Sequence, residues 1–220
     1  MIDPMDFLLW AKGTMFDWAL AIFAIGLAAR IVEIFMLGRK PDYAEPRAGE
    51  WGPGLRTMIT RTVADPGTLQ RAPFDVTVGM IWHVGFLIAL LLFIPHIELI
   101  NSVLGIAWPG LPTPLVDAVA AVTILSLIAV LIHRLVHPVK RHISSVEDYL
   151  VWIVTFLPLI TGYLAYHRLI SPYPLALGLH ISSVEIFLIL LPFTKLTHIF
   201  TAFIARWYTG ATFGRKGVAT

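Results

Sequence analysis

Five apolar runs, each of roughly twenty residues, are the feature that most constrains the fold of this chain. A run of that length crosses the hydrocarbon core of a bilayer as one α-helix, because the helix satisfies its own backbone polar groups. Hydrophobic residues make up 57% of the 220 residues and charged residues only 14%, which leaves little chain for a soluble domain. We therefore expect an all-α integral membrane protein, a single five-helix bundle formed by residues 1–220.

Charged residues or clusters of proline and glycine bound each expected span. The first run follows Asp3 and Asp6 instead of a basic segment, so we expect a retained helix and not a cleaved signal peptide. Ser144 and Glu147 have the spacing of a capping box at the start of the fourth span. The spans are expected at residues 14–37, 77–98, 114–136, 147–167 and 175–200.

Basic residues are distributed unevenly over the connections between these spans. One side has only Lys12 and Arg168. Because basic residues near span ends stay in the cytoplasm, we expect the amino terminus outside and the carboxyl terminus in the cytoplasm. The net charge of +2 then favours contact with acidic lipid headgroups over nucleic acid. The basic residues assigned to the cytoplasmic side are Arg39, Lys40, Arg47, Arg56, Arg61, Arg71, Arg134, Lys140, Arg141, Arg206, Arg215 and Lys216.

His180 and His198 stand in the last apolar stretch. On one continuous helix their spacing is about five whole turns, so both rings would leave the same face about 27 Å apart. Two imidazoles in opposite halves of a span are candidates for axial ligands of two stacked b-type haems. The chain has no cysteine, so it supplies no thiolate to an iron–sulfur cluster and no thioether to a c-type haem.

The second span offers His83 and His96 at matching depths. His83 lies toward the cytoplasmic side and is expected to face His198 across one haem. His96 and His180 both belong to the outer side. His83 and His96 are about 140° apart on an ideal helix, so Pro95 would have to distort the last turn before His96 could point inward. The alternative is that His96 is an interfacial side chain at a helix end.

A family resemblance rests on two of these segments. Leu-Pro-Phe-Thr-Lys-Leu-Thr-His at 191–198, preceded by His180, resembles the last helix of the respiratory nitrate reductase gamma subunit. Trp-His-Val-Gly at 82–85 resembles the Phe-His-Ile-Gly of that family. The resemblance implies two b haems, with His83 and His198 binding the inner one and His180 the outer one. It further implies oxidation of menaquinol or ubiquinol near the outer face, a cytoplasmic iron–sulfur partner subunit, and a bacterial or archaeal inner membrane.

Two departures from the family pattern matter. Where the family has its second ligand in the second span, this chain has Phe93, which cannot bind iron. His96 is the expected replacement and His167 the reserve, and with neither the chain would hold one haem. The 38–76 loop is also longer than expected, which favours related subunits that serve heterodisulfide-reductase-like or sulfur-cycle complexes.

Polar residues in and beside the spans have more than one interpretation. Arg30 and Arg134 are candidates for binding haem propionates, because an arginine inside a span usually needs an anionic partner, although snorkelling also explains Arg30. Glu185 is either paired with another helix or part of a proton route. The histidines near the cytoplasmic end are expected to be interfacial and not a metal clamp; these are His133, His137 and His142.

Quinol oxidation releases protons, so a quinone site needs titratable groups within reach of the quinol hydroxyl. The region bounded by His96, Glu98 and Asp117 offers carboxylates beside the outer haem, although Asp117 would also stabilise a helix start. The expected function is that of a dihaem cytochrome b which relays electrons between a quinone and an iron–sulfur partner. The alternatives are a one-haem protein, a non-redox membrane anchor, and electron flow in the reverse direction, as a quinone reductase.

Overall fold

The computed structural model describes residues 3–38 and 43–218, and within these ranges it contains helices and no strand. Arg39 and Lys40, two of the residues used to assign orientation, lie outside the described residues. Five helices are long and apolar enough to cross a membrane, which confirms the all-α, multi-pass architecture. These spans are Pro4–Leu37, Pro73–Leu92, Thr113–Val136, Val146–Tyr166 and Tyr173–Phe193.

The first span is a long helix with an irregular turn near its start. It consists of α1 (Pro4–Trp10), the π-helical turn η1 (Ala11–Met15) and α2 (Phe16–Leu37). Asp3 caps the helix through its side chain, so the helix begins well before the predicted start at residue 14. Gly13 has φ −106° and ψ −106° inside the π-helical turn, a conformation that interrupts the regular hydrogen-bond ladder.

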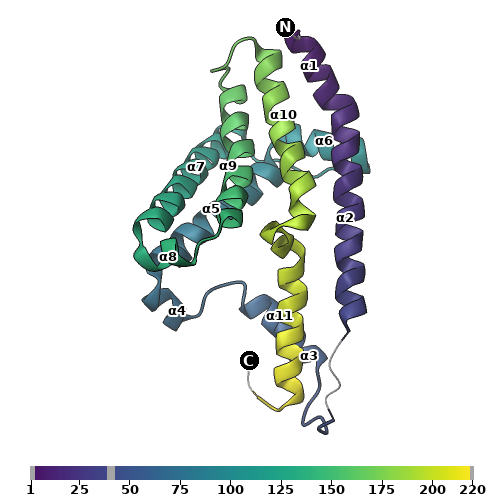
Figure 1. Cartoon of the computed structure of the whole chain (residues 1–220), viewed down its shortest axis with the longest axis vertical. Coiled ribbons are helices and arrows are strands. Elements are labelled where there is room, and N and C mark those ends of the chain that lie inside the picture. Colours follow the sequence, from purple (N-terminus) through teal and green to yellow (C-terminus); the bar gives the residue numbers. More distant parts are fainter. Residues whose placement is uncertain (1–2, 39–42, 219–220) are drawn as a thin grey trace.

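The remaining four spans pack side by side in chain order, and the first and last of them also contact each other. α5 packs on α7, α7 on α9 and α9 on α10, and α10 also packs along α1 and α2 (Figure 1). Phe86 of α5 and Phe187 of α10 have ring centres 5.8 Å apart, so the ends of this row of four helices meet. The bounds are Pro73–Leu92 for α5, Thr113–Val136 for α7, Val146–Tyr166 for α9 and Tyr173–Leu190 for α10.

Small residues allow the spans to approach closely. A Cβ atom at Gly85 of α5 would collide with the hydroxyl of Thr123 on α7, and one at Gly26 of α2 would lie 2.6 Å from the ring of Pro192. Helices in lipid associate through such close packing, because lipid tails are as apolar as the side chains they replace. Phe86 contacts both apolar clusters that fill the bundle and therefore lies at its centre.

Two of the predicted spans are interrupted. α5 ends at Leu92, Phe93 is extended with φ −82° and ψ 124°, and α6 (Ile94–Leu104) begins a new direction. The continuous helix predicted over 175–200 is wrong. After Leu190 the chain forms a 3-10 turn, η2 (Leu191–Phe193), an extended residue, a second 3-10 turn, η3 (Lys195–Thr197), and then α11 (His198–Arg215).

The loop between the first two spans is folded against the carboxyl-terminal helix. α3 (Trp51–Thr60) packs along α11, with the rings of Trp51 and Trp207 centred 5.2 Å apart. A Cβ atom at Gly210 would lie 2.5 Å from the carbonyl oxygen of Pro53, which shows how closely the two backbones approach. Two short helices, α4 (Pro66–Arg71) and α8 (Pro138–Ile143), lie at the same end of the bundle as α11 (Figure 1).

Candidate functional site

The four histidines expected as ligands lie in two pairs. The ring centres of His83 and His198 are 6.3 Å apart, and those of His96 and His180 are 6.1 Å apart. His83 lies within α5 and His180 within α10, both in the body of a span. Their partners His198 and His96 lie in the first turns of α11 and α6, the helices that follow the two breaks. The structure therefore brings together the residues that the sequence grouped by depth.

The sequence predicts a straight helix through His180 and His198 and another through His83 and His96, and both predictions are wrong. His180 and His198 do not share one helix face, because two 3-10 turns separate α10 from α11. His96 does not belong to α5, so the expected conflict of about 140° with His83 does not arise. Pro95 lies in the first turn of α6, where its missing amide costs no helical hydrogen bond.

In three of the four rings, Nδ1 donates a hydrogen bond to a main-chain carbonyl oxygen. A carbonyl oxygen can only accept, so the hydrogen lies on Nδ1 and the Nε2 lone pair of the neutral ring is free to bind a metal. Such bonds fix both tautomer and ring orientation in metal-binding histidines. The bonds run from His83 to Gly79 at 2.7 Å, from His96 to Ala89 at 2.8 Å, and from His198 to Lys195 at 2.7 Å.

The ring of His180 is oriented by a side chain of α9. The hydroxyl of Thr161 donates to the carbonyl oxygen of Leu157 at 2.6 Å, so it accepts from Nδ1 of His180 at 3.3 Å. Gly162 makes room for this ring, since a Cβ atom there would lie 2.9 Å from Cε1 of His180. All four rings thus have Nδ1 engaged.

The spacing within each pair matches that of two axial ligands. An imidazole nitrogen binds a transition metal at about 2 Å, and the ring centre lies about 1 Å behind it, so two rings across one metal ion have centres about 6 Å apart. The observed separations are 6.3 Å and 6.1 Å. The described part of the chain has no group of three or more His, Asp or Glu suited to a metal ion. A metal between either pair would need its other ligands from a non-protein group, as haem iron does.

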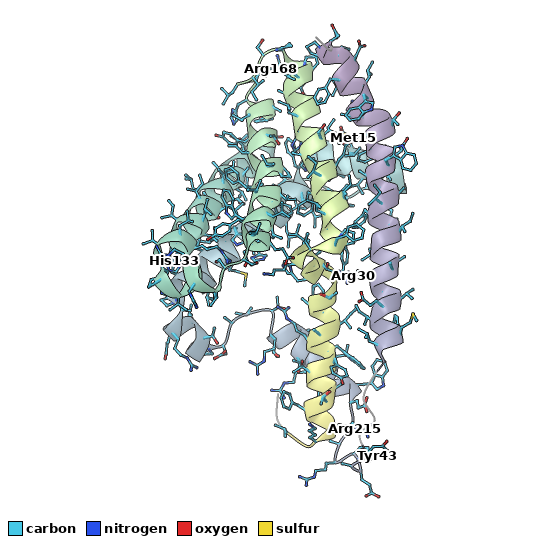
Figure 2. The ribbon with its side chains drawn as sticks, in the orientation of Figure 1. Met15, Arg30, Tyr43, His133, Arg168 and Arg215 are labelled. Atoms are coloured by element: carbon cyan, nitrogen blue, oxygen red, sulfur yellow. The ribbon has the colours of Figure 1, made fainter. Side chains whose placement is uncertain are left out.

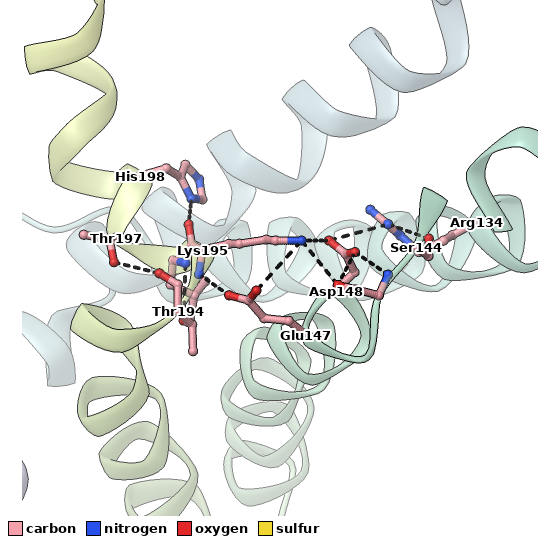
Figure 3. A network of polar contacts seen from close by, with 10 residues as sticks. Arg134, Ser144, Glu147, Asp148, Thr194, Lys195, Thr197 and His198 are labelled. Atoms are coloured by element: carbon pink, nitrogen blue, oxygen red, sulfur yellow. Dashed lines mark hydrogen bonds and ion pairs between the residues drawn. The ribbon is translucent and has the colours of Figure 1, made fainter. Parts of the chain in front are cut away.

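The break before His198 is held by the first turn of α9 (Figure 3). The main-chain N–H of Lys195 donates to Oε1 of Glu147 at 2.9 Å, and its Nζ donates to Oδ1 of Asp148 at 2.9 Å. Because the carbonyl oxygen of the same lysine accepts from Nδ1 of His198, these bonds help to position that ring. Nothing in the residue types alone indicated this network.

The capping box of α9 is one residue later than predicted. Ser145 and Asp148 form it, with both reciprocal hydrogen bonds present, and the predicted pair of Ser144 and Glu147 does not. The helix begins at Val146, so Ser144 lies outside it and donates to the carbonyl oxygen of Lys140 at 2.7 Å instead. Glu147 is thereby available for the contact with Lys195.

Both arginines expected near haem propionates lie beside the segments that surround His198. Arg30 donates through Nε to the carbonyl oxygen of Pro192 at 2.8 Å and through Nη1 to Glu33 at 2.7 Å. Arg134 donates through Nη1 to the hydroxyl of Ser144 at 2.9 Å. Arg30 and His133 are labelled in Figure 2, which places them on opposite sides of the bundle toward its α11 end.

The expected quinone-site residues are only partly brought together. Asp117 of α7 lies 2.8 Å from Nε2 of His167, at the end of α9. Glu98 on α6 is exposed. His167, the reserve ligand, is thus paired with a carboxylate, whereas His96 lies beside His180. Phe93, at the position of the lost family ligand, has its ring 5.2 Å from that of His96.

No protein-family model matches the chain. It is similar over nearly its whole length to a protein of Nitratidesulfovibrio vulgaris (strain Hildenborough) that carries only the name "Protein". The two are 27% identical over 220 residues, and the match covers 94% of each. The two chains are therefore of comparable length, and the name of that relative states no activity.

Proposed function

We propose that the chain is a dihaem b-type cytochrome, the membrane subunit that relays electrons between a quinone and a cytoplasmic iron–sulfur partner. The observation that carries the proposal is the separation of about 6 Å between the ring centres of each histidine pair, which equals the distance between the centres of two imidazoles that bind one metal ion from opposite sides. Free Nε2 atoms on rings whose Nδ1 atoms are engaged support it further. The resemblance to the nitrate reductase gamma subunit points the same way.

Each residue of the site has a proposed role. His83 and His198 hold the inner haem, and His96 and His180 hold the outer one. When bound, a bis-histidine haem changes its oxidation state by one electron without releasing either ligand. Phe86 packs against Phe187 in the bundle core and helps to exclude water there. We call His83 with His198 the inner pair and His96 with His180 the outer pair.

The arginines are proposed to bind the propionates of the inner haem. A guanidinium carries five N–H donors, and the hydrogen bonds of Arg30 use Nε and Nη1, whereas that of Arg134 uses Nη1. The N–H groups on Nη2 of both arginines take no part in these bonds and are available to donate to a haem propionate. Partly exposed arginines with such partners avoid the free-energy cost of an unpaired charge in the membrane.

Quinol oxidation is proposed at the outer end, beside the outer pair. Asp117 is the general base, and His167, 2.8 Å from it, shares the proton that the carboxylate accepts. Glu98 is the second proposed acid–base group, exposed to water on α6. This assignment places the amino terminus outside and α11 in the cytoplasm of a bacterial or archaeal inner membrane, as the positions of the basic residues predict.

The proposal is tested by the absorption spectrum of the purified protein. Reduced-minus-oxidised spectra should show a b-type α band, and pyridine haemochrome should give about two haems per chain, one for each bis-histidine pair. His142→Ala is the matched control, since this exposed histidine belongs to neither pair and its loss should leave the haem content unchanged. A ratio near one haem per chain would indicate a one-haem protein. A spectrum without the α band would indicate a membrane anchor without haem.

A further inference from the structure

Glu185 is the most unusual polar residue of the bundle. It lies in the middle of α10 with 0% of its surface exposed, and neither carboxylate oxygen has a hydrogen-bond partner among residues 3–38 and 43–218. The hydroxyl of Ser182, almost one helical turn earlier, is also buried and unpartnered within the same ranges. Three buried polar atoms on neighbouring positions of one helix thus lack the partners that such groups nearly always have.

The first span lies against this face of α10. A Cβ atom at Gly178 would lie 2.7 Å from the ring of Phe7 in α1. Glu185 follows Gly178 by two helical turns, about 10 Å along the axis, and therefore faces the same neighbour. His180 points the other way, toward Gly162 of α9. The carboxyl group is accordingly on the side of α10 that faces away from the outer pair.

The irregular turn of the first span lies at the level of Glu185. The first span and α10 run in the same direction, because Gly178 contacts Phe7 and Pro192 contacts Gly26 (Figure 1). Seven residues beyond Phe7 the chain is in η1, which Met15 marks beside α10 in Figure 2. A π-helical turn rearranges the backbone hydrogen bonds, and such turns often occur at functional sites.

No described residue pairs with a negative charge at this position. The elements packed against α10 are α1, η1, α2, η2 and α9, and α5 and α6 also contact it through Phe86 and His96. None of their described residues forms an ion pair or hydrogen bond with Glu185. An isolated carboxylate in an apolar interior is so costly that the side chain takes up a proton instead. The titratable residues of these elements and of α10 are Asp6, Lys12, Asp17, Arg30, Glu33, Asp75, His83, His96, Glu98, Glu147, Asp148, Tyr149, Tyr163, Tyr166, Tyr173 and His180.

We propose that Glu185 is a proton-binding site in the interior of the membrane. The side chain holds a proton as a neutral carboxylic acid, and the Ser182 hydroxyl and the η1 backbone are the polar groups through which this proton exchanges. If the outer pair held a metal centre that gained one electron, uptake of one proton at this site would keep the net charge of the interior unchanged, and the proton would leave with the electron. This coupling rests on the proposed function, whereas the proton-binding site itself does not.

The first experiment uses dicyclohexylcarbodiimide, an apolar reagent that reacts with protonated carboxyl groups. The full-length protein in detergent or vesicles is treated at neutral pH, and the modified residue is located by mass spectrometry. Glu185 should be labelled, and Glu185→Gln should lose that label, whereas Glu45→Gln, at an exposed position in the first loop, should keep it. An unlabelled Glu185 beside labelled exposed carboxyls would overturn the site. Because this readout needs no haem, it is independent of the proposed function.

The second experiment is redox-difference infrared spectroscopy of the loaded protein. The carbonyl stretch of a protonated carboxylic acid should change between the oxidised and reduced states, be lost in Glu185→Gln and return at a shifted position in Glu185→Asp. A labelled Glu185 with no redox-dependent band would overturn the coupling. A protein without any haem spectrum would instead refute the proposed function, and the labelling result would still decide whether the carboxyl group binds a proton.

Discussion

The Nζ atom of Lys195 lies 2.9 Å from Oδ1 of Asp148 and joins the break before His198 to the first turn of α9 (Figure 3). The contact links the start of the fourth span to the segment that follows the fifth, at the level where the inner pair is formed. Asp148 also completes the capping box of α9 with Ser145. One carboxylate thus serves both the helix start and the segment that carries a proposed ligand.

Replacing Asp148 with alanine is expected to remove both contacts. The loss of a helix cap and of a partly exposed ion pair should lower the free energy of unfolding by about 1–2 kcal/mol. Thermal unfolding in detergent measures this change. Ser145→Ala removes the side-chain cap and only a 3.4 Å contact with Lys195, whereas Lys195→Met removes the ion pairs with Asp148 and Glu147. Haem loss at the inner pair should therefore follow Lys195→Met more closely than Ser145→Ala. Equal haem content in both would contradict the positioning role.

Histidine replacements are expected to divide into two groups. His83→Ala and His198→Ala should each remove the inner haem, and His96→Ala and His180→Ala should each remove the outer one, because the rings face one another in these pairs. Redox titration followed at the α band identifies which midpoint potential disappears. Loss of the same potential in His83→Ala and His180→Ala would show that the pairing is wrong.

Gly162→Ala is expected to disturb the outer pair and leave the inner pair intact. The new methyl group would lie 2.9 Å from Cε1 of His180, so the ring must turn away from Thr161. The expected result is a shifted potential or reduced occupancy of the outer haem. Gly52→Ala is the matched control, because a Cβ atom at that glycine of α3 meets nothing within 4 Å and α3 carries none of the four histidines. The proposal loses support if both variants behave alike.

Asp117→Asn is expected to slow quinol-dependent haem reduction while the haem content stays unchanged. The amide cannot accept a proton, although it preserves the shape of the contact with His167. Stopped-flow reduction by a quinol analogue measures the rate, and dithionite reduction of the same sample serves as its control. Glu98→Gln should slow the reaction in the same way. An inhibitor that perturbs only the inner haem would move the quinone site to the cytoplasmic end.

The spans were predictable from the sequence because hydrophobic length alone decides which segments can cross a bilayer. The two breaks were not, since apolar residues continue across Phe93, and Lys195 with its neighbouring threonines could equally stand at the polar end of a continuous helix. Pro95 and Pro192 were the available signals, and a proline weakens a helix without specifying the direction taken after it. The helix arithmetic for His180 and His198 therefore failed, although expected depth in the membrane grouped the histidines whose rings the structure brings together.

The contacts that position the rings were beyond sequence reasoning for a different reason. Lys195 and Asp148 are far apart in the chain, as are Asp117 and His167, and each pair meets only because two spans end at the same level. Their residue types are ordinary for helix ends. Glu185 was visible as an acid within an apolar run, but the absence of a hydrogen-bond partner for it among the described residues depends on which face of α10 packs against the first span.

The two breaks also bear on how such a protein is assembled. His83 and His180 lie within spans, whereas His96 and His198 each lie in the first turn of a helix that begins after a break. Under the proposed function, each haem would be held between a span and the start of the helix that follows a break. Binding of the haem would then fix the direction in which α6 or α11 leaves the bundle, so that cofactor loading and the last step of folding would be one event.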